Sequence, residues 1–376
     1  MRARGGFTLI ELMVAMALTL FIMVILSQAF VASLDTFSGL KAIGDMQQNL
    51  RTAEVMLRDD LSQDHFEGKR RVSDLTIVAN ASELNAHHPQ AGFFAVRQSS
   101  PLSAVAGAPY YNEGNDSFTV PSVRAVDHMI YMTVKRKGNR PENFFNTALQ
   151  GDAGTLGTFF NVNTAYDIPS TDLPYSTQTL KYDGSTTGYF SSQWAEVLYY
   201  LVRTGSTEQP NDPTSTLGTP TYGLYRAQFV MVPDATNLTG KFANAKLDPT
   251  FIGLSCNPDG ATLKFYTPAD AAVIGQRVIP DLTAFDPLDP RVFKAATLVC
   301  PNVIAFNVRI ISLNANLTNL TFGDLSFAST YKGVYDTAKF QVTGYPNNGL
   351  RGIQVTLRVW DNKTRQTRQA TVTQDL

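Results

Sequence analysis

The sequence predicts an α+β fold in which one long N-terminal helix, partly membrane-spanning and partly amphipathic, packs on an antiparallel β-sheet with large loop and strand insertions. Two observations predict it. Residues 7–66 contain no proline and carry apolar residues at helical spacing. The rest of the chain is rich in Gly, Pro, Thr and Asn, which favour strands and turns. With 376 residues, 44% of them hydrophobic and 17% charged, the chain can bury a large core.

The N-terminal segment has the length of a membrane-spanning helix. Phe7 to Phe30 is roughly 24 residues, or about 36 Å of helix, and a bilayer's hydrocarbon core is about 30 Å thick. Arg2 and Arg4 precede it, so the positive-inside rule predicts a cytoplasmic N-terminus. The apolar run is too long for a secretory signal, and the Ala32 region is a poor cleavage site. We expect a leader (1–6), a transmembrane half-helix (7–34), an amphipathic half-helix (35–66) and an exported β-rich body (67–376).

Glu11 is the only charged residue between Phe7 and Phe30. A carboxylate in a membrane-spanning segment opposes insertion, so we expect a partner to compensate for it. The alternative is that Glu11 is incidental and that its side chain reaches the lipid headgroups.

The stretch GFTLIEL at residues 6–12, which follows a short basic leader, resembles the cleavage and methylation motif of type IV prepilins and type II secretion pseudopilins. The resemblance implies that a membrane prepilin peptidase cuts after Gly6 and methylates the new N-terminal residue, Phe7. It also implies a partner for Glu11, the ammonium group of Phe7 in a neighbouring filament subunit. Unit charges about 4 Å apart at an effective dielectric constant near 20 attract by about 4 kcal/mol before desolvation, enough to set a register.

Apolar residues continue at intervals of three and four and predict one helix over about residues 8–65. They are Leu34, Phe37, Leu40, Ile43, Met46 (or Gln47), Leu50, Ala53, Leu57 and Leu61. We expect this stripe to pack on the sheet and the charged residues between positions 51 and 59 to be solvated. Gly39 and Gly44 are either points of bending or sites of close packing.

Four segments of the body have strong strand character: residues 194–202, 223–229, 303–310 and 352–360. The first two predict a hairpin with a long connection. In the last, apolar residues from Ile353 to Val359 alternate with polar ones, which predicts one buried face.

The order of these strands is similar to that of J-type pseudopilins and W-type minor pilins, which carry a Trp-x-x-Val-x-Tyr strand, a Leu-x-Arg strand and paired C-terminal strands. The resemblance implies enlarged insertions here, at residues 72–128, 135–190, 205–221 and 235–300, because those relatives are smaller. K-type pseudopilins are closer in size but typically lack the glutamate that Glu11 provides. A body of about 300 residues would crowd a dense filament lattice, so we expect a minor subunit.

The body carries no persuasive catalytic motif, so we expect no enzyme. His87 and His88 fit an exposed loop, and the pair Asp127-His128 has no nucleophile motif beside it. No cofactor is expected. Calcium binding stays open, because Asp and Asn oxygens cluster at residues 112–116, 257–260 and 286–289. None of these clusters has EF-hand spacing, so no site is assigned.

Cys256 and Cys300 match no zinc motif. If the body is exported, they are a reasonable disulfide pair that closes a loop of about 44 residues. The alternative is two buried thiols that never meet.

The run from Lys135 to Arg140 is a dense basic stretch. It could contact phosphates, but the net charge is −1 and only Phe144-Phe145 lies nearby as an aromatic platform. A solvated loop is the better interpretation, and no nucleic-acid partner is predicted.

The sequence therefore predicts a single-pass inner-membrane protein with a periplasmic or extracellular body, which joins a type IV pilus or type II secretion pseudopilus at or near its tip. Its expected partners are prepilin peptidase, other pilins or pseudopilins, the inner membrane and an assembly motor complex. An alternative is a membrane-tethered tip adhesin or DNA-uptake binding protein. An anchored periplasmic enzyme is a third possibility, which the missing catalytic motif disfavours.

Overall fold

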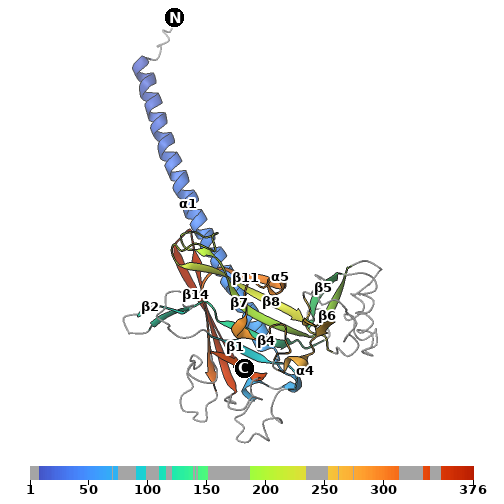
Figure 1. Ribbon diagram of the computed structural model, residues 1–376. Coiled ribbons are helices and arrows are strands. Elements are labelled where there is room, and N and C mark those ends of the chain that lie inside the picture. The colour runs from blue at the N-terminus through green and yellow to red at the C-terminus, as the bar shows by residue number, and fades with distance from the viewer. Residues whose placement is uncertain are drawn as a thin grey trace.

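The computed structural model consists of one long helix and a β-rich body (Figure 1). The N-terminal part of the helix projects away from the body, and the C-terminus lies within the body. The structure describes residues 8–69, 71–74, 90–98, 110–115, 121–138, 140, 143–150, 187–233, 253–260, 262–273, 275–312, 333–338 and 349–376.

Helix α1 (Leu9–Ser62) is 54 residues long and uninterrupted, which confirms the predicted helix. It ends at the C-cap Gln63 and is followed by two short 3₁₀ turns, η1 (Glu67–Lys69) and η2 (Val72–Asp74). Neither candidate glycine breaks it. A Cβ added to Gly44 would meet nothing within 4 Å, and one added to Gly39 would meet only Thr364 Cγ2, at 3.9 Å, so close packing does not require glycine at either position.

The body is built on an eight-stranded antiparallel sheet with the order β12-β1-β4-β7-β8-β11-β13-β14. The strands are β1 (Phe94–Arg97), β4 (Met129–Lys135), β7 (Trp194–Ser206), β8 (Pro220–Val230), β11 (Ala296–Ser312), β12 (Val334–Asp336), β13 (Leu350–Asp361) and β14 (Gln366–Asp375). All four predicted strands are present, and β7 and β8 form the predicted hairpin. The α+β class is therefore confirmed.

The smaller elements fall within the predicted insertions. Three two-stranded ribbons pair β2 (Tyr110–Asn115) with β3 (Pro121–Ala125), β5 (Phe145–Gln150) with β6 (Thr187–Ser192), and β9 (Cys256–Asp259) with β10 (Thr262–Phe265). Three short helices follow β10: α4 (Pro268–Ala271), η5 (Leu282–Ala284) and α5 (Pro290–Lys294).

One face of the sheet buries the C-terminal half of α1, which contacts β11, β13 and β14. The helix contributes Met46, Leu50, Ala53, Leu57 and Leu61 to this core. On β13 the predicted alternation is confirmed, because Ile353, Val355, Leu357 and Val359 are buried and the residues between them are half-buried.

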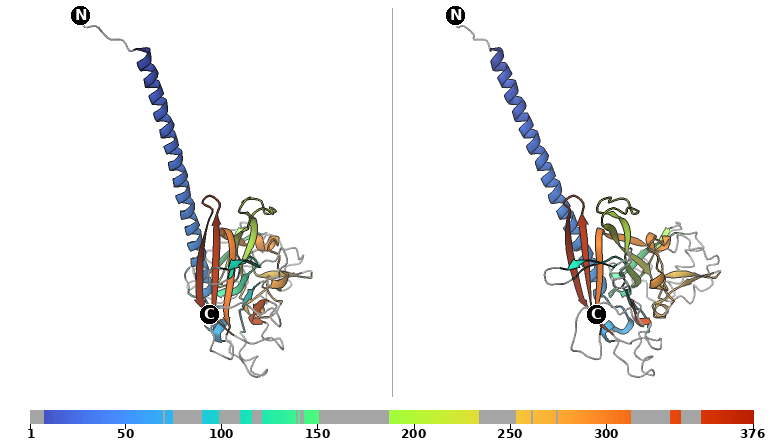
Figure 2. Two further views of the ribbon diagram at one scale, coloured as in Figure 1. Left: turned by 90° about the vertical axis from the view of Figure 1, so that its left-hand side faces the viewer. Right: turned by 60° about the vertical axis from the view of Figure 1, so that its left-hand side comes forward.

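The N-terminal end of the predicted stripe does not pack on the sheet. Leu34, Phe37 and Leu40 are 51%, 69% and 64% exposed, so the expectation was wrong for these three residues. Leu34 precedes the part of α1 that contacts the body (Figure 2). Phe37 and Leu40 lie on the side of the helix turned away from the body, because Ser38, Lys41 and Ala42 border the pocket next to β13.

The opposite face of the sheet carries a second core. Side chains from β4, β7 and β8, including Tyr131, Leu198 and Phe229, pack against Val278, Ile279 and other apolar residues of the 268–295 segment. The sheet therefore lies between α1 on one side and an insertion on the other, which explains why β7 is buried on both faces from Trp194 to Val202.

Candidate functional site

The N-terminal end of α1 is held by a capping box between Thr8 and Glu11. The Glu11 backbone N–H donates to Thr8 Oγ1 at 3.3 Å, and the Thr8 backbone N–H donates to Glu11 Oε2 at 2.9 Å. Thr8 Oγ1 also donates to the same carboxylate oxygen at 3.0 Å. The carboxylate thus accepts hydrogen bonds that the first turn of a helix cannot make internally.

This local partner was missed at the sequence level, although the spacing Thr8-x-x-Glu11 signals a capping box. The Glu11 carboxylate is directed toward the start of the helix, where residue 7 is joined to Thr8. Gly6 and Phe7 themselves lie outside the described residues.

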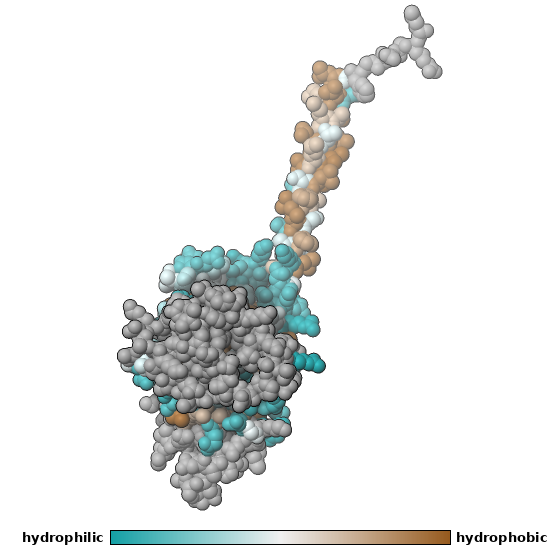
Figure 3. Space-filling model, turned by 90° about the vertical axis from the view of Figure 1, so that its right-hand side faces the viewer, coloured by the Kyte–Doolittle hydropathy of each residue, from teal (hydrophilic) through white to brown (hydrophobic). Residues whose placement is uncertain are grey.

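The segment of α1 from Leu9 to Phe37 is exposed and predominantly apolar. By length and composition it qualifies as a membrane-spanning helix, and none of its most apolar stretch is buried within the protein. Figure 3 shows this segment as a mostly apolar rod leaving a hydrophilic end of the body. Such a surface needs cover from lipid or from other helices.

The buried half of α1 is fixed by an acidic residue within its apolar stripe. Asp60 is only 2% exposed and accepts hydrogen bonds from Tyr199 Oη at 2.5 Å and from Arg226 Nε and Nη2 at 2.7 and 3.1 Å. Burial and the Asp60 carboxylate raise the pKa of Tyr199, which therefore stays a donor. The sequence signal was a carboxylate beside Leu61 and one turn after Leu57, on the face expected to be apolar.

The basic run at the end of β4 contacts the C-terminal end of α1. Lys137 Nζ lies 2.6 Å from Asp64 Oδ2, and Arg136 Nη2 lies 4.0 Å from Asp59 Oδ2. The Arg136 guanidinium also stacks 4.2 Å from the centre of the Phe145 ring. These contacts lie at the surface, and Lys137, Gly138 and Arg140 are exposed, in keeping with the solvated loop that the sequence suggested.

Glu196 is completely buried in the second core. It accepts hydrogen bonds from Tyr131 Oη, from Ser255 Oγ and from the Val278 backbone N–H, the last at 3.3 Å. Burial raises the pKa of Glu196. Because Ser255 and Val278 belong to the insertion, these bonds fasten the insertion to the sheet.

A buried ion pair between Arg277 and Asp336 also joins the insertion to the sheet. Arg277 Nη1 and Nη2 donate to the Asp336 carboxylate of β12 at 2.8 and 3.0 Å, and Arg277 Nε donates to the Ala271 carbonyl at 2.7 Å. The guanidinium lies 3.7 Å from the centre of the Phe93 ring. These buried polar groups hold secondary-structure elements together, and sequence reasoning identified none of them as paired.

The histidine of the Asp127-His128 pair is also structural. His128 Nδ1 accepts a hydrogen bond from the Val308 backbone N–H at 3.0 Å, and burial lowers the pKa of His128 to about 3. Asp127 lies 3.8 Å from Arg97 Nη2. His87 and His88 lie outside the described residues.

Cys256 on β9 and Cys300 on β11 are both buried, and neither forms a disulfide in this structure. This arrangement corresponds to the second of the two alternatives and not to a disulfide. Burial raises the pKa of each thiol to about 12, which disfavours the reactive thiolate.

The described parts of the calcium candidates lie in strands β2 and β9 and in the turn and helix cap before α5. The Asn257 amide donates to the Arg277 carbonyl at 2.8 Å. Asp286 Oδ1 accepts from the Leu288 N–H, and Asp289 Oδ1 accepts from the Arg291 N–H at the start of α5. Across the described residues, no three His, Cys, Asp or Glu side chains gather where they could hold a metal ion.

Comparison with known families matches residues 1–27 to the prokaryotic N-terminal methylation motif. This match supports a type IV pilin-like precursor that prepilin peptidase processes and that assembles with other pilins. The motif marks structural proteins, and it includes Gly6, Phe7 and Glu11. No curated protein and no solved structure matched the chain.

Proposed function

We propose that this protein is a minor subunit of a type IV pilus or a type II secretion pseudopilus, located at or near the filament tip. The methylation motif, together with the exposed apolar helix whose first part it includes, carries the proposal. Prepilin peptidase cuts after Gly6 and methylates Phe7. The subunit then spans the inner membrane once, with a cytoplasmic N-terminus, until an assembly motor extracts it into the filament.

The arrangement of the sheet supports a J-type or W-type subunit. The Trp-x-x-Val-x-Tyr strand β7 lies beside the Leu-x-Arg strand β8, and β13 and β14 form a C-terminal hairpin in the same sheet. The ribbons and short helices of the insertions enlarge this body. A filament end accommodates such bulk more readily than the interior of a helical lattice.

Assembly depends on Glu11 in this proposal. Its carboxylate already lies at the start of the helix, and the ammonium group of a neighbouring subunit's Phe7 supplies the opposite charge. The pair sets the axial register of packed helices, and the loss of one partner leaves a costly unpaired charge.

The test is the variant Glu11→Gln in the full-length chain. Glutamine can still act as the third residue of a capping box, so the change removes the charge and keeps the cap. We expect unchanged protein in the membrane and at least about tenfold less in sheared filaments, because a charge-assisted contact contributes about 1.5–3 kcal/mol. Glu54→Gln, which removes only an exposed ion pair with Arg58, is the matched control. Wild-type incorporation of Glu11→Gln would contradict the proposal.

The tip position has its own test. Gold-labelled antibody against the body should decorate filament ends, in keeping with a minor subunit. Uniform labelling along the filament would instead indicate a major subunit.

A tip adhesin or DNA-uptake protein is the second candidate, and one surface favours it. The face of β11, β13 and β14 opposite α1 has a groove of about 590 Å³ whose described lining residues include Arg309, Arg358 and Arg368 and no carboxylate. If this groove binds an anionic ligand, Arg309→Gln with Arg358→Gln should abolish binding to cells and leave filament number unchanged. Unchanged binding would remove this candidate.

A further inference from the structure

The turn between β13 and β14, residues 362–365, lies where α1 leaves the body. Thr364 Cγ2 is 3.9 Å from the position that a Cβ on Gly39 would occupy, so the turn touches the helix. Figure 2 shows the tip of this hairpin beside the helix, with the C-terminus at the far end of the body. The turn is therefore the part of β13 and β14 nearest to the exposed apolar segment.

The length of the helix places this turn at the level of lipid headgroups. From Leu9 to Gly39, α1 rises by about 45 Å. A bilayer is about 40–45 Å thick when the headgroup regions are included. If Leu9 lies at the outer edge of one headgroup region, the turn beside Gly39 meets the headgroups of the opposite leaflet.

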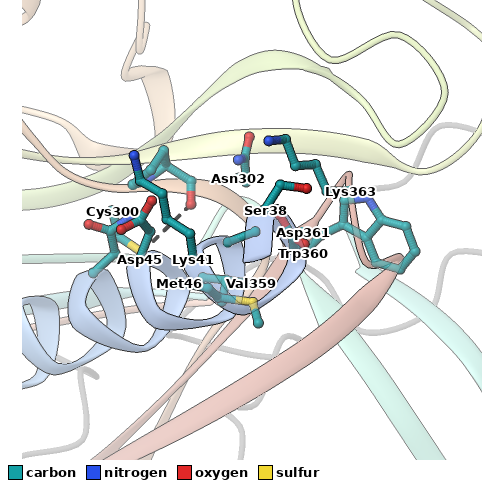
Figure 4. Close-up of a pocket in the computed structure, with 13 residues that line it drawn as sticks. Ser38, Lys41, Asp45, Met46, Cys300, Asn302, Val359, Trp360, Asp361 and Lys363 are labelled. Carbon is teal, nitrogen blue, oxygen red and sulfur yellow. Dashed lines mark hydrogen bonds between the residues drawn. The ribbon is translucent and has the colours of Figure 1, made fainter. Parts of the chain in front are cut away.

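The side chains at this level have the chemistry of a membrane interface. Lys41, Lys363 and Arg365 are exposed, and Trp360 is half-buried. Lys41 and Lys363 border a cavity of about 340 Å³ that Ser38, Asn302 and Asp45 also line, while the ring of Trp360 is directed away from it (Figure 4). Lysine, arginine and tryptophan are the residues that anchor proteins at membrane surfaces. We call Lys41, Trp360, Lys363 and Arg365 the basic rim.

The turn and its flanking Asp361 carry two cations, Lys363 and Arg365, and one carboxylate. Asp361 accepts hydrogen bonds from the Thr364 N–H at 2.8 Å and from Thr364 Oγ1 at 2.5 Å, so its carboxylate is engaged within the turn. Asp35 and Asp45 lie on α1. Glu208 and Asp212 lie in the β7–β8 connection, which reaches the same end of the body at a distance from the helix (Figure 2).

The backbone at Arg365 is an independent observation. Its φ is 53°, in the left-handed region that glycine adopts without penalty and that a branched or long side chain adopts at a cost. Hairpin turns commonly place glycine at such a position. An exposed arginine there has a backbone cost that glycine would not have, and it lies in the turn at the headgroup level.

We propose that the basic rim binds phospholipid headgroups of the leaflet from which α1 emerges, with the three cations on the phosphates and Trp360 at the interface. This inference rests on the membrane-inserted stage of the proposed function. The rim then holds the body against the bilayer before assembly, and extraction into a filament has to break these contacts.

The two tryptophans of the chain provide the test. Trp194 is buried in the second core, so the full-length Trp194→Phe variant leaves Trp360 as the reporter. The protein is reconstituted into phosphatidylcholine vesicles, with or without phosphatidylglycerol, that carry a nitroxide-labelled headgroup lipid. We expect Trp360 fluorescence to be quenched, more strongly with phosphatidylglycerol, and the difference to vanish near 1 M salt, where the Debye length is about 3 Å.

Charge variants in the Trp194→Phe background distinguish the contribution of the basic rim to headgroup contact from that of the membrane anchor α1. Arg365→Gly relieves the backbone and removes the charge, and together with Lys363→Gln it should weaken headgroup contact by about fivefold per residue. Arg351→Gln, at the other end of β13, makes the same charge change and should have no effect.

Alkaline washing of the vesicles reports on α1 separately. Protein that resists the wash but shows the same quenching in both lipid mixtures and in the charge variants would overturn the rim proposal and leave the membrane anchor intact. Protein that the wash releases would contradict both the anchor and the rim.

Discussion

Asp60 fixes the buried half of α1 through residues that only the folded chain brings together. Its partners, Tyr199 and Arg226, lie on β7 and β8, and the pair is almost fully enclosed. A buried ion pair adds little net stability compared with apolar packing, but removing one partner leaves the other charge buried and uncompensated. The pair therefore specifies how the helix sits on the sheet.

Asp60→Asn should lower the free energy of unfolding by about 3–5 kcal/mol, because Arg226 then lacks its carboxylate. Urea unfolding of the full-length protein in detergent measures this. Asp59→Asn is the control, since Asp59 is exposed and its nearest cation, Arg136, is 4.0 Å away. Equal stability of the two variants would show that the buried pair does not fix the helix.

His128 makes the body sensitive to acid. Its pKa is lowered by burial to about 3, whereas the unfolded chain has an ordinary value near 6.5. Between pH 6.5 and 3 the unfolded state binds more protons, so the free energy of unfolding falls as the pH falls. Burial lowers the pKa of His65 as well, which adds to this trend, and raises that of Glu196, which opposes it.

His128→Gln should flatten this pH dependence, because the amide oxygen can accept the Val308 N–H and does not become charged. Unfolding curves at pH 7, 5 and 4 measure the slope. An unchanged slope would mean that other groups cause the loss of stability in acid.

At the scale of elements, local patterns in the sequence were enough to predict α1 and strands β7, β8, β11 and β13. Periodicity reports which face of an element is apolar, and that face was correct from Met46 to Leu61. Periodicity does not report what covers that face, so the prediction that Leu34, Phe37 and Leu40 pack on the sheet was wrong. The polar pairs of Asp60, Glu196 and Arg277 could not be predicted, because their partners lie far away in the sequence.

The glycines of α1 allow an element-level prediction. Gly44→Ala should stabilise the helix by up to about 1 kcal/mol, because a Cβ there meets no atom within 4 Å. Gly92→Ala is the contrasting variant: Gly92 has a φ of 89°, and its Cβ would clash with the His65 carbonyl. Thermal unfolding should rank Gly44→Ala above and Gly92→Ala below the wild-type protein. A destabilised Gly44→Ala would point to a strained helix at that position.

At the scale of the whole molecule, one part folds on itself and another requires cover from outside. The body encloses two cores, one on each face of its sheet. The exposed apolar segment of α1 has no such cover, and the methylation motif at residues 1–27 includes its first part. Lipid in the membrane and helices of other subunits in a filament are the two environments that can satisfy this surface in turn.

The measurement that tests this account most directly is the mass of the N-terminal peptide from protein purified out of its native membrane. The account predicts a peptide that begins at Phe7 and carries one added methyl group. Protein from cells that lack prepilin peptidase should keep the leader and serves as the control. An intact Met1 in the native protein, or cleavage near Ala32, would contradict processing as a pilin and leave α1 as a tether or signal.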